Sequence, residues 1–290
     1  MKSRLIRLTG ILLSISYSAL GQLSPMKSQY FVNSYQVNPS MAARDGRASL
    51  FSNVSSQWTP MPGSPQMLSI SGSLPLTNRA SAGLNIIGDK SGLLKRSQAM
   101  GSFAYRLPVG ESQDIRLGVS LALTQDRLDN GTATPNGMND PSLMNYNDTR
   151  EETWDGNFGI AYTSGKLEAQ FAYLNLNQKR SETFSTVDYS TFYSSVAYQF
   201  ELDADFRVKP LFAYRGVNNY KNQWDAAIEW GVFSKGFNLY TMYHSNKSVT
   251  GGFGFEYESK LLISGYFNSE PKQLTGLTGG IFDLVVGYKF

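Results

Sequence analysis

The chain has 290 residues, of which 41% are hydrophobic, 17% charged and 13% aromatic, and its formal net charge is +3. It contains no cysteine and one histidine, which excludes a disulfide framework, a thiolate zinc site, a cysteine nucleophile and the multi-histidine sites of zinc enzymes. A mean hydropathy of −0.29 is too polar for a bundle of membrane helices, whereas low charge with 17 Phe, 17 Tyr and 27 Gly favours extended β structure, including the kind that spans a membrane.

Residues 1–21 have the form of a secretory signal peptide. Three basic residues precede a mostly apolar run over residues 8–20, and small residues occupy the positions before the cleavage site that a signal peptidase recognises. We therefore expect cleavage near Gly21 and Gln22. The leader holds three of the 26 Lys and Arg and none of the 23 Asp and Glu, so the mature chain has no net charge. Basic charge therefore gives no support for a nucleic-acid partner.

Residues 22–46 lack a regular alternation and are interrupted by Pro25 and Pro39, so they are not expected to form a lipid-facing strand. Apolar side chains such as Phe31 and Tyr35 nevertheless give the segment surface to pack against the rest of the protein. Two interpretations stay open. The segment enters the lumen of a barrel or closes its periplasmic mouth, or it is a partly ordered leader.

From residue 47 to residue 290 the hydrophobic pattern has a period of two. Residues 114–124 show it best, because every second side chain is apolar: Ile115, Leu117, Val119, Leu121 and Leu123. A strand places such residues on one wall, whereas a helix would scatter them. The same division recurs over residues 154–162, 206–214, 224–232, 249–257 and 282–290.

Fourteen strands are expected, at residues 47–58, 66–75, 79–87, 97–107, 114–124, 154–163, 166–176, 190–200, 205–214, 223–233, 236–244, 249–258, 260–268 and 280–290. Many are about ten residues long, which crosses a bilayer at the tilt of a barrel, and aromatic residues cluster near their ends. Even-numbered connections are mostly tight, and odd-numbered ones such as 88–96 and 125–153 are mostly longer. The chain is therefore predicted to be an all-β transmembrane antiparallel barrel of about 14 strands, with short periplasmic turns and long extracellular loops, in the outer membrane of a diderm bacterium.

The last strand supports this prediction. Apolar residues are spaced by two up to the carboxyl terminus, and Tyr288 and Phe290 end the series. This form of last strand resembles the assembly signal of outer-membrane barrels.

Several motifs resemble those of the PorP/SprF family of type IX secretion outer-membrane proteins. SQYFVNSYQVNPSMAA, at residues 28–43, is similar to the opening motif of that family, and GLNIIGDKSG, at residues 83–92, is similar to a later one. Similarity continues through Gln57-Trp58, the Tyr-Arg-Leu-Pro of residues 105–108 and the end of the chain. The residues that carry the family motifs are Gln29, Tyr30, Asn38, Pro39, Gln57, Trp58, Gly83, Asp89, Lys90 and Gly92.

The resemblance implies a non-enzymatic component of type IX secretion that anchors or helps to export an adhesin-like surface protein. Its implied partners are outer-membrane lipid, the periplasmic secretion machinery and a client with a C-terminal sorting domain; involvement in gliding motility stays open. An alternative from another class is a passive channel for small or hydrophobic solutes, similar to fatty-acid transporter barrels. The domains expected are a signal peptide (1–21), an N-terminal periplasmic or luminal segment (22–46) and a barrel (47–290).

The long connection at residues 125–153 is the candidate partner-facing loop, because long loops on rigid scaffolds commonly carry binding sites. Its oxygen-rich composition could hold Ca²⁺, but the Asp-x-Asp-x-Asp-Gly spacing is absent, so a solvated polar loop is preferred. No other cofactor or metal is expected. The acidic residues of the loop are Asp126, Asp129, Asp140, Asp148, Glu151 and Glu152.

No catalytic residue is expected. His244 and Ser245 are adjacent, and adjacent positions on an extended strand face opposite sides, so the histidine is interpreted as an exposed residue at a strand end. Charged residues on the polar face of the strands, such as Arg116, Glu168 and Asp225, carry both signs. This mixture argues against a strongly ion-selective pore and favours pairing across the lumen.

Overall fold

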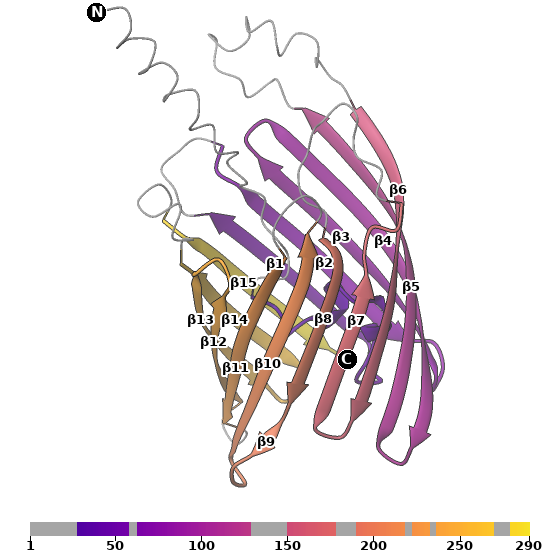
Figure 1. The fold of residues 1–290 in the computed structure, drawn as a ribbon, viewed down its shortest axis with the longest axis vertical. Coiled ribbons are helices and arrows are strands. Elements are labelled where there is room, and N and C mark those ends of the chain that lie inside the picture. Colours follow the sequence, from indigo (N-terminus) through magenta and orange to yellow (C-terminus); the bar gives the residue numbers. More distant parts are fainter. Residues whose placement is uncertain are drawn as a thin grey trace, which may run out of the picture.

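A computed structural model describes residues 28–57, 63–128, 150–177, 190–217, 222–232, 236–269 and 279–290. Its strands form one antiparallel sheet that closes on itself as a 14-strand barrel (Figure 1). β8 and β9 act as two parts of one strand, since both pair with β10 on either side of Gln199. The strands are β1 (Ser49–Gln57), β2 (Gln66–Pro75), β3 (Ala80–Ser91), β4 (Leu94–Gly110), β5 (Gln113–Leu128), β6 (Arg150–Ser164), β7 (Leu167–Tyr173), β8 (Ser190–Tyr198), β9 (Phe200–Glu201), β10 (Phe206–Val217), β11 (Gln223–Val232), β12 (Phe237–His244), β13 (Val249–Tyr257), β14 (Leu261–Asn268) and β15 (Ile281–Lys289).

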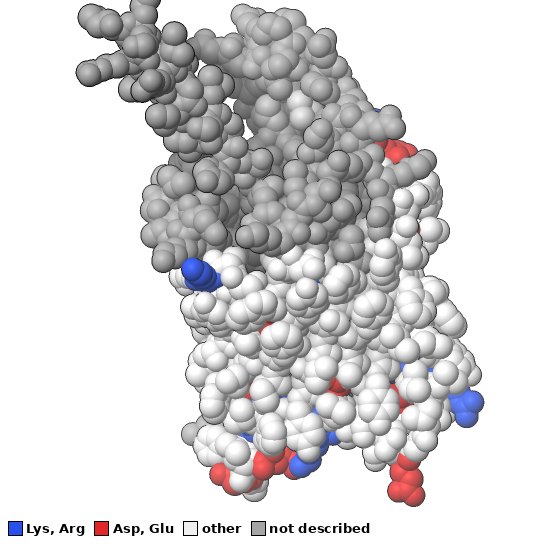
Figure 2. Space-filling model, viewed as in Figure 1, with Lys and Arg blue, Asp and Glu red and all other residues white. Residues whose placement is uncertain are grey.

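The predicted fold class is confirmed, and alternation along each strand explains it. In β5, Val119 and Leu121 are more than half exposed on the outer face, whereas Arg116 and Asp126 are buried on the inner face. Figure 2 shows the consequence on one face of the barrel. Between the two ends, the described surface of that face carries few charged residues. Among the described residues, no helix is long and apolar enough to cross a membrane.

The two ends of the barrel differ in the length of their connections. The turns that follow β2, β4, β6, β9, β11 and β13 span two to four residues each. β1 begins and β15 ends at this periplasmic end, where Ser49 pairs with Lys289. The opposite, extracellular end carries the long connections, including those between β5 and β6 and between β7 and β8.

Five strands extend farther than predicted: β3, β4, β5 and β6, and also β10, which continues to Val217. β3 and β4 pair as far as Ser91 and Leu94, so the connection expected at 88–96 is a two-residue turn at residues 92–93. β5 continues to Leu128 and β6 begins at Arg150, so the loop expected at 125–153 is shorter at both ends. Beyond the bilayer the outer face is no longer required to be apolar, so alternation ends before the hydrogen-bonded strand does.

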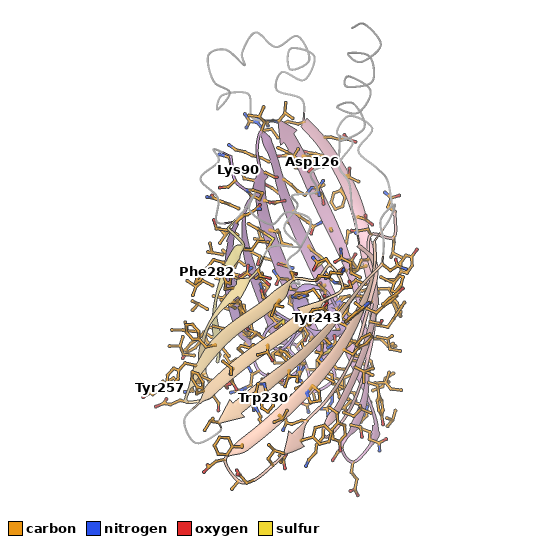
Figure 3. All side chains as sticks on the ribbon, turned by 60° about the vertical axis from the view of Figure 1, so that its left-hand side comes forward. Lys90, Asp126, Trp230, Tyr243, Tyr257 and Phe282 are labelled. Carbon is orange, nitrogen blue, oxygen red and sulfur yellow. The ribbon has the colours of Figure 1, made fainter. Side chains whose placement is uncertain are left out.

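Aromatic side chains mark the two membrane interfaces. Trp154, Trp224 and Tyr243 are exposed near the extracellular ends of their strands. Trp230 and Tyr257 are exposed toward the periplasmic end. Figure 3 shows Trp230 and Tyr257 low on the barrel, Tyr243 and Phe282 above them, and Lys90 and Asp126 higher still on the extension of β3–β6. Trp58, one of the family-motif residues, lies outside the described residues.

We predict that Val119→Arg lowers the free energy of unfolding in lipid vesicles by about 2–4 kcal/mol, because it places a cation on the lipid face near the bilayer midplane. The matched control is Val109→Arg, which changes an equally exposed valine at the periplasmic rim and should cost about 0–1 kcal/mol. Equal losses for the two variants, measured by denaturant titration, would show that the membrane is not centred on β5 as described.

Candidate functional site: the luminal segment

Residues 28–48, which we call the luminal segment, lie along the inner wall of the barrel. At the extracellular side, the Ser28 hydroxyl donates to the Asp283 carboxylate over 2.6 Å. At the periplasmic rim, the Lys289 ammonium donates to the Asp45 carboxylate over 2.9 Å. The segment therefore crosses the lumen and leads directly into β1. It forms two short 3-10 helices, η1 (Ser34–Gln36) and η2 (Pro39–Met41).

Asn38 and Pro39 lie against a slot in the wall that two glycines create. Gly118 of β5 and Gly159 of β6 are directly paired. A Cβ atom on Gly118 would lie 2.2 Å from the Ser40 nitrogen, and one on Gly159 would lie 2.0 Å from the Asn38 side-chain oxygen. Because only glycine leaves room for this approach, the wall is shaped to receive the Asn-Pro motif.

Hydrogen bonds fix the same motif in place. The Asn38 oxygen accepts from the Ser40 backbone N–H and hydroxyl, at 3.1 and 2.7 Å, and so caps η2. The Asn38 amide donates to the Gln170 oxygen of β7 over 3.1 Å. Arg116 donates to the carbonyl oxygens of Ser40 and Ala42, at 2.9 and 2.8 Å. The carbonyl groups at the C-terminal end of η2 thereby accept hydrogen bonds from a cation of the wall.

The lumen has a polar side and an apolar side, and the segment matches both. On the wall of β2, Ser71 accepts from Asn33 over 2.7 Å and Ser69 accepts from Gln36 over 2.5 Å. On the opposite wall, ring pairs lie near contact distance, with centroids 6.2 Å apart for Tyr30–Tyr193 and 5.9 Å apart for Phe31–Tyr240. The segment is therefore held by specific hydrogen bonds on one side and by aromatic packing on the other.

Tyr30 joins a buried polar network near the extracellular end. Asp225 accepts from the Tyr30 hydroxyl and from Arg215, the latter over 2.9 Å, and contacts His244 Nδ1 at 2.6 Å. The other ring nitrogen of His244 lies 2.7 Å from the Thr250 hydroxyl. The expectation of an exposed histidine is wrong, because strand parity directs His244 inward beside Asp225. Thr250 is fully buried, and the network ties the segment to the wall.

Inward-facing charges are sorted along the barrel axis. Among the described residues, the extracellular half carries six carboxylates and two arginines: Asp89, Asp126, Glu151, Asp155, Asp225 and Asp283, with Arg96 and Arg215. The periplasmic half carries seven cations and six carboxylates: Arg44, Arg47, Arg106, Arg116, Arg207, Lys209 and Lys289, with Asp45, Asp114, Glu168, Glu201, Glu229 and Glu256. The mixture of signs expected from the sequence is thus uneven: the extracellular half of the lumen has an excess of carboxylates, and the periplasmic half has an excess of cations.

The structure separates the family-motif residues into two groups. Gln29, Tyr30, Asn38 and Pro39 are buried in the lumen, and Gly83 lies beneath the Tyr35 ring, which a Cβ atom would meet at 2.4 Å. The second group lies toward the extracellular end. Asp89 and Lys90 are on the β3 extension, Gly92 is in the following turn with its N–H donating to the Gly63 carbonyl over 2.9 Å, and Gln57 ends β1.

The remaining site residues lie elsewhere on the barrel. Tyr288 is exposed on the outer face of β15, and Phe290 packs edge-to-face against it with centroids 5.0 Å apart. Asp126 is buried in β5 and paired with Arg96 over 2.7 Å. Glu151 and Glu152 lie in β6, whereas Asp129, Asp140 and Asp148 fall outside the described residues. Within the described ranges, no group of three or more His, Asp or Glu side chains could hold a metal ion.

Comparison with known families decides the identity. The sequence profile described as "Type IX secretion system membrane protein PorP/SprF" matches residues 19–288. The chain belongs to the PorP/SprF family. The buried Asn-Pro motif of this PorP/SprF protein is thus part of a match that covers nearly its whole length. No curated protein sequence matches the chain.

Solved structures of outer-membrane proteins share the fold of this PorP/SprF protein at low sequence identity. The CymD monoaromatic hydrocarbon channel has a TM-score of 0.55 and 10% identity, over 89% of this chain and 92% of that one. The toluene transporter TbuX of Ralstonia pickettii has a TM-score of 0.52 and 13% identity, over 87% and 91%. Omp33 of Acinetobacter baumannii has a TM-score of 0.51 and 8% identity, over 84% and 98%. These similarities establish a shared barrel architecture.

We predict that Gly118→Ala displaces the Asn-Pro motif, because the new methyl group overlaps backbone atoms of the luminal segment. Amide hydrogen exchange of residues 28–48 should accelerate, and the barrel should lose about 1–3 kcal/mol of stability. Gly101→Ala on the neighbouring strand is the control, since a Cβ atom there meets nothing within 4 Å. Unchanged exchange in Gly118→Ala would show that the slot does not hold the segment.

Proposed function

We propose that this PorP/SprF protein is a rigid anchor for type IX secretion. In this proposal, extracellular loops hold the sorting domain of an adhesin-like client, and the periplasmic end contacts the secretion machinery. Membership of the family supports the secretory role. The single observation that favours an anchor over a conduit is that the protein's own residues 28–48 occupy its lumen, bonded to the wall from Asp283 to Lys289.

Releasing the luminal segment from the barrel would disrupt several kinds of contact at once. Release would separate buried hydrogen bonds at Asn33, Gln36 and Asn38, and expose the aromatic surface of Tyr30. Each buried polar group left without a partner costs about 1–3 kcal/mol. The segment therefore stiffens the barrel from within while the extracellular loops of the barrel hold the client. We also propose that the mature chain begins at Gln22, as the leader sequence indicates.

A passive channel is the second candidate. Two observations favour it: the shared fold with a hydrocarbon channel, and the apolar side of the lumen, which includes Tyr193, Tyr240 and Met242. The two candidates differ in whether the unaltered protein conducts.

We predict that the full mature protein is silent in planar bilayers and that deletion of residues 28–45, with the signal peptide retained for export, produces steady conductance. The physical reason is that the deletion removes the side chains that fill the lumen. Substantial steady conductance of the unaltered protein would instead favour the channel. Conductance that is unaffected by the deletion would remove the plugging role of the segment.

A second prediction concerns the extracellular loop. Replacing residues 129–149 with a short Gly-Ser linker should leave a folded, heat-resistant barrel, because the paired parts of β5 and β6 end at Leu128 and begin at Arg150. Surface display of the client should fall as far as in a strain without the gene, measured by whole-cell immunolabelling of type IX clients. If display and secretion of every client persist without the gene, the anchoring function is wrong.

A further inference from the structure

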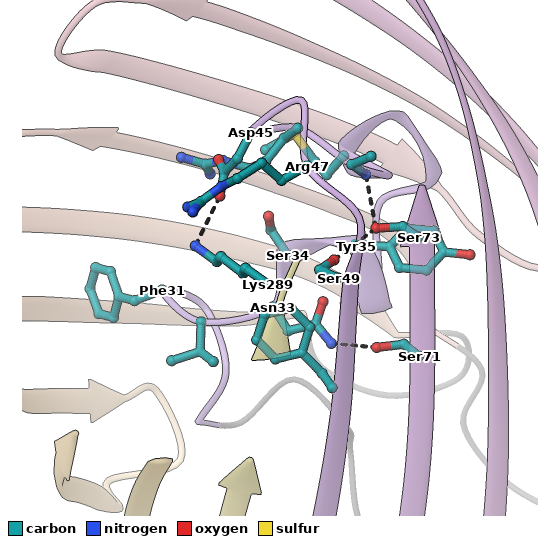
Figure 4. Close-up of a pocket in the computed structure, with 15 residues that line it drawn as sticks. Phe31, Asn33, Ser34, Tyr35, Asp45, Arg47, Ser49, Ser71, Ser73 and Lys289 are labelled. Carbon is teal, nitrogen blue, oxygen red and sulfur yellow. Dashed lines mark hydrogen bonds and ion pairs between the residues drawn. The ribbon is translucent and has the colours of Figure 1, made fainter. Parts of the chain in front are cut away.

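A cavity of about 110 Å³ opens at the periplasmic mouth, between the luminal segment and the wall formed by β1, β2 and β15 (Figure 4). Figure 4 shows Asp45, Arg47 and Lys289 on one side of it and Ser34, Ser49 and Ser73 close by. Fifteen residues line the cavity, and they include three cations, Arg44, Arg47 and Lys289, but one carboxylate, Asp45.

The ion pairs around the cavity leave one cation uncompensated. Asp45 contacts both Lys289, at 2.9 Å, and Arg44, at 3.2 Å, and Arg44 also contacts Glu168 at 2.5 Å. Burial would raise the pKa of Asp45, but the charges of Arg44 and Lys289 outweigh it and hold that pKa below its ordinary value. Within the described part of the chain, Arg47 donates to the Ser259 carbonyl over 3.0 Å and contacts no carboxylate.

The size of the cavity limits its occupant to a single small group. One water needs about 10–15 Å³ of such space, so the cavity has room for several water molecules. This is enough for a carboxylate on a short aliphatic stem and too little for a whole cofactor, which needs at least about 300 Å³. Arginines and serines both line the cavity, and a guanidinium group suits the flat, two-oxygen geometry of a carboxylate.

The location decides between a lipid and a peptide as the source of that group. Lipid headgroups surround the outer face of the barrel, whereas Ser49, Ser71 and Ser73 line the cavity from inward-facing positions. A peptide in the periplasm reaches this mouth directly. The excess of cations in the periplasmic half of the lumen attracts acidic groups toward it.

We infer that the mouth cavity binds the carboxylate side chain of an acidic peptide segment presented from the periplasm. Naming the secretion machinery as the source of that peptide rests on the proposed function, whereas the site itself does not. Asn33 and Tyr35 also line the cavity, so the bound group contacts the luminal segment as well as the wall. Occupancy is thereby linked to the position of the segment that fills the lumen.

Because the chain has no cysteine, Ser49→Cys introduces a unique reporter at the cavity edge. Its rate of reaction with a negatively charged methanethiosulfonate reagent is compared with that of a positively charged one of similar size. Ser112→Cys, in an exposed periplasmic turn, is the reference site. The anionic-to-cationic rate ratio should exceed that at the reference by about fivefold, and Arg47→Gln should lower it toward the reference value. An equal ratio at the two sites would overturn the cationic character of the cavity.

Binding is tested by asking whether a peptide protects the Ser49→Cys thiol from labelling by an uncharged methanethiosulfonate reagent. The peptide Gly-Gly-Glu with an amidated C-terminus should slow labelling several-fold. Gly-Gly-Gln, amidated in the same way so that it carries no carboxylate, should not. Arg47→Gln should abolish protection, whereas Arg79→Gln, an exposed arginine in the β2–β3 turn, should preserve it. Equal protection by both peptides would overturn the carboxylate site, and stronger protection by inorganic phosphate than by Gly-Gly-Glu would overturn the choice of a peptide.

The same variants separate this inference from the proposed function. If Gly-Gly-Glu protects the purified protein but Arg47→Gln secretes and displays clients normally, the site stands and its role in secretion is wrong. If protection is absent while deletion of the gene abolishes display, the cavity assignment is wrong and the anchoring function is unaffected.

Discussion

The pairing of the first strand with the last is the constraint on which the rest of the structure depends. In lipid, every backbone N–H and C=O group must find a partner within the protein, so a spanning sheet must close. Nine residue pairs join β1 to β15, from Ser49–Lys289 to Gln57–Ile281. Closure places the start of β1 at the periplasmic rim, beside the end of the chain. The residues before β1 therefore begin at the mouth of the lumen, and the inward face of the wall provides partners for them.

The inner wall is specialised for that segment. Where the Asn-Pro motif meets the wall, Gly118 and Gly159 leave a slot, and Gly83 leaves room for the Tyr35 ring. Serines on β2 accept hydrogen bonds from the side-chain amides of the segment, and aromatic rings on β8 and β12 pack against its aromatic residues. A barrel filled in this way resists deformation, which suits a protein whose loops hold a client. The sorting of charge along the axis then distinguishes the two mouths, with cations facing the periplasmic side.

The sequence predicts the barrel well because lipid imposes a strict alternation on every spanning strand. It predicts the extensions of β3–β6 poorly, since water imposes no such pattern on Asp89 or Lys90. The family motif pointed to Gln29, Tyr30, Asn38 and Pro39, but not to the partners that receive them. Inward glycines on adjacent strands are a detectable signal for the slot, yet pairing Gly118 with Gly159 requires the register. The sequence predicts an exposed His244 because its partner Asp225 lies on the neighbouring strand and not next to it in the chain.

The most direct measurement is a cysteine cross-link between the luminal segment and the wall in intact cells. The Asn33 amide and the Ser71 hydroxyl are 2.7 Å apart, and the native chain contains no competing thiol. We predict that Asn33→Cys/Ser71→Cys forms a disulfide on mild oxidation, so that tryptic fragments cut between the two positions stay joined until reduction. Asn33→Cys paired with Ser195→Cys, which faces the lumen from β8 on the other side of the barrel, should not cross-link. Absence of the first link, or equal formation of both, would contradict a segment folded in the lumen.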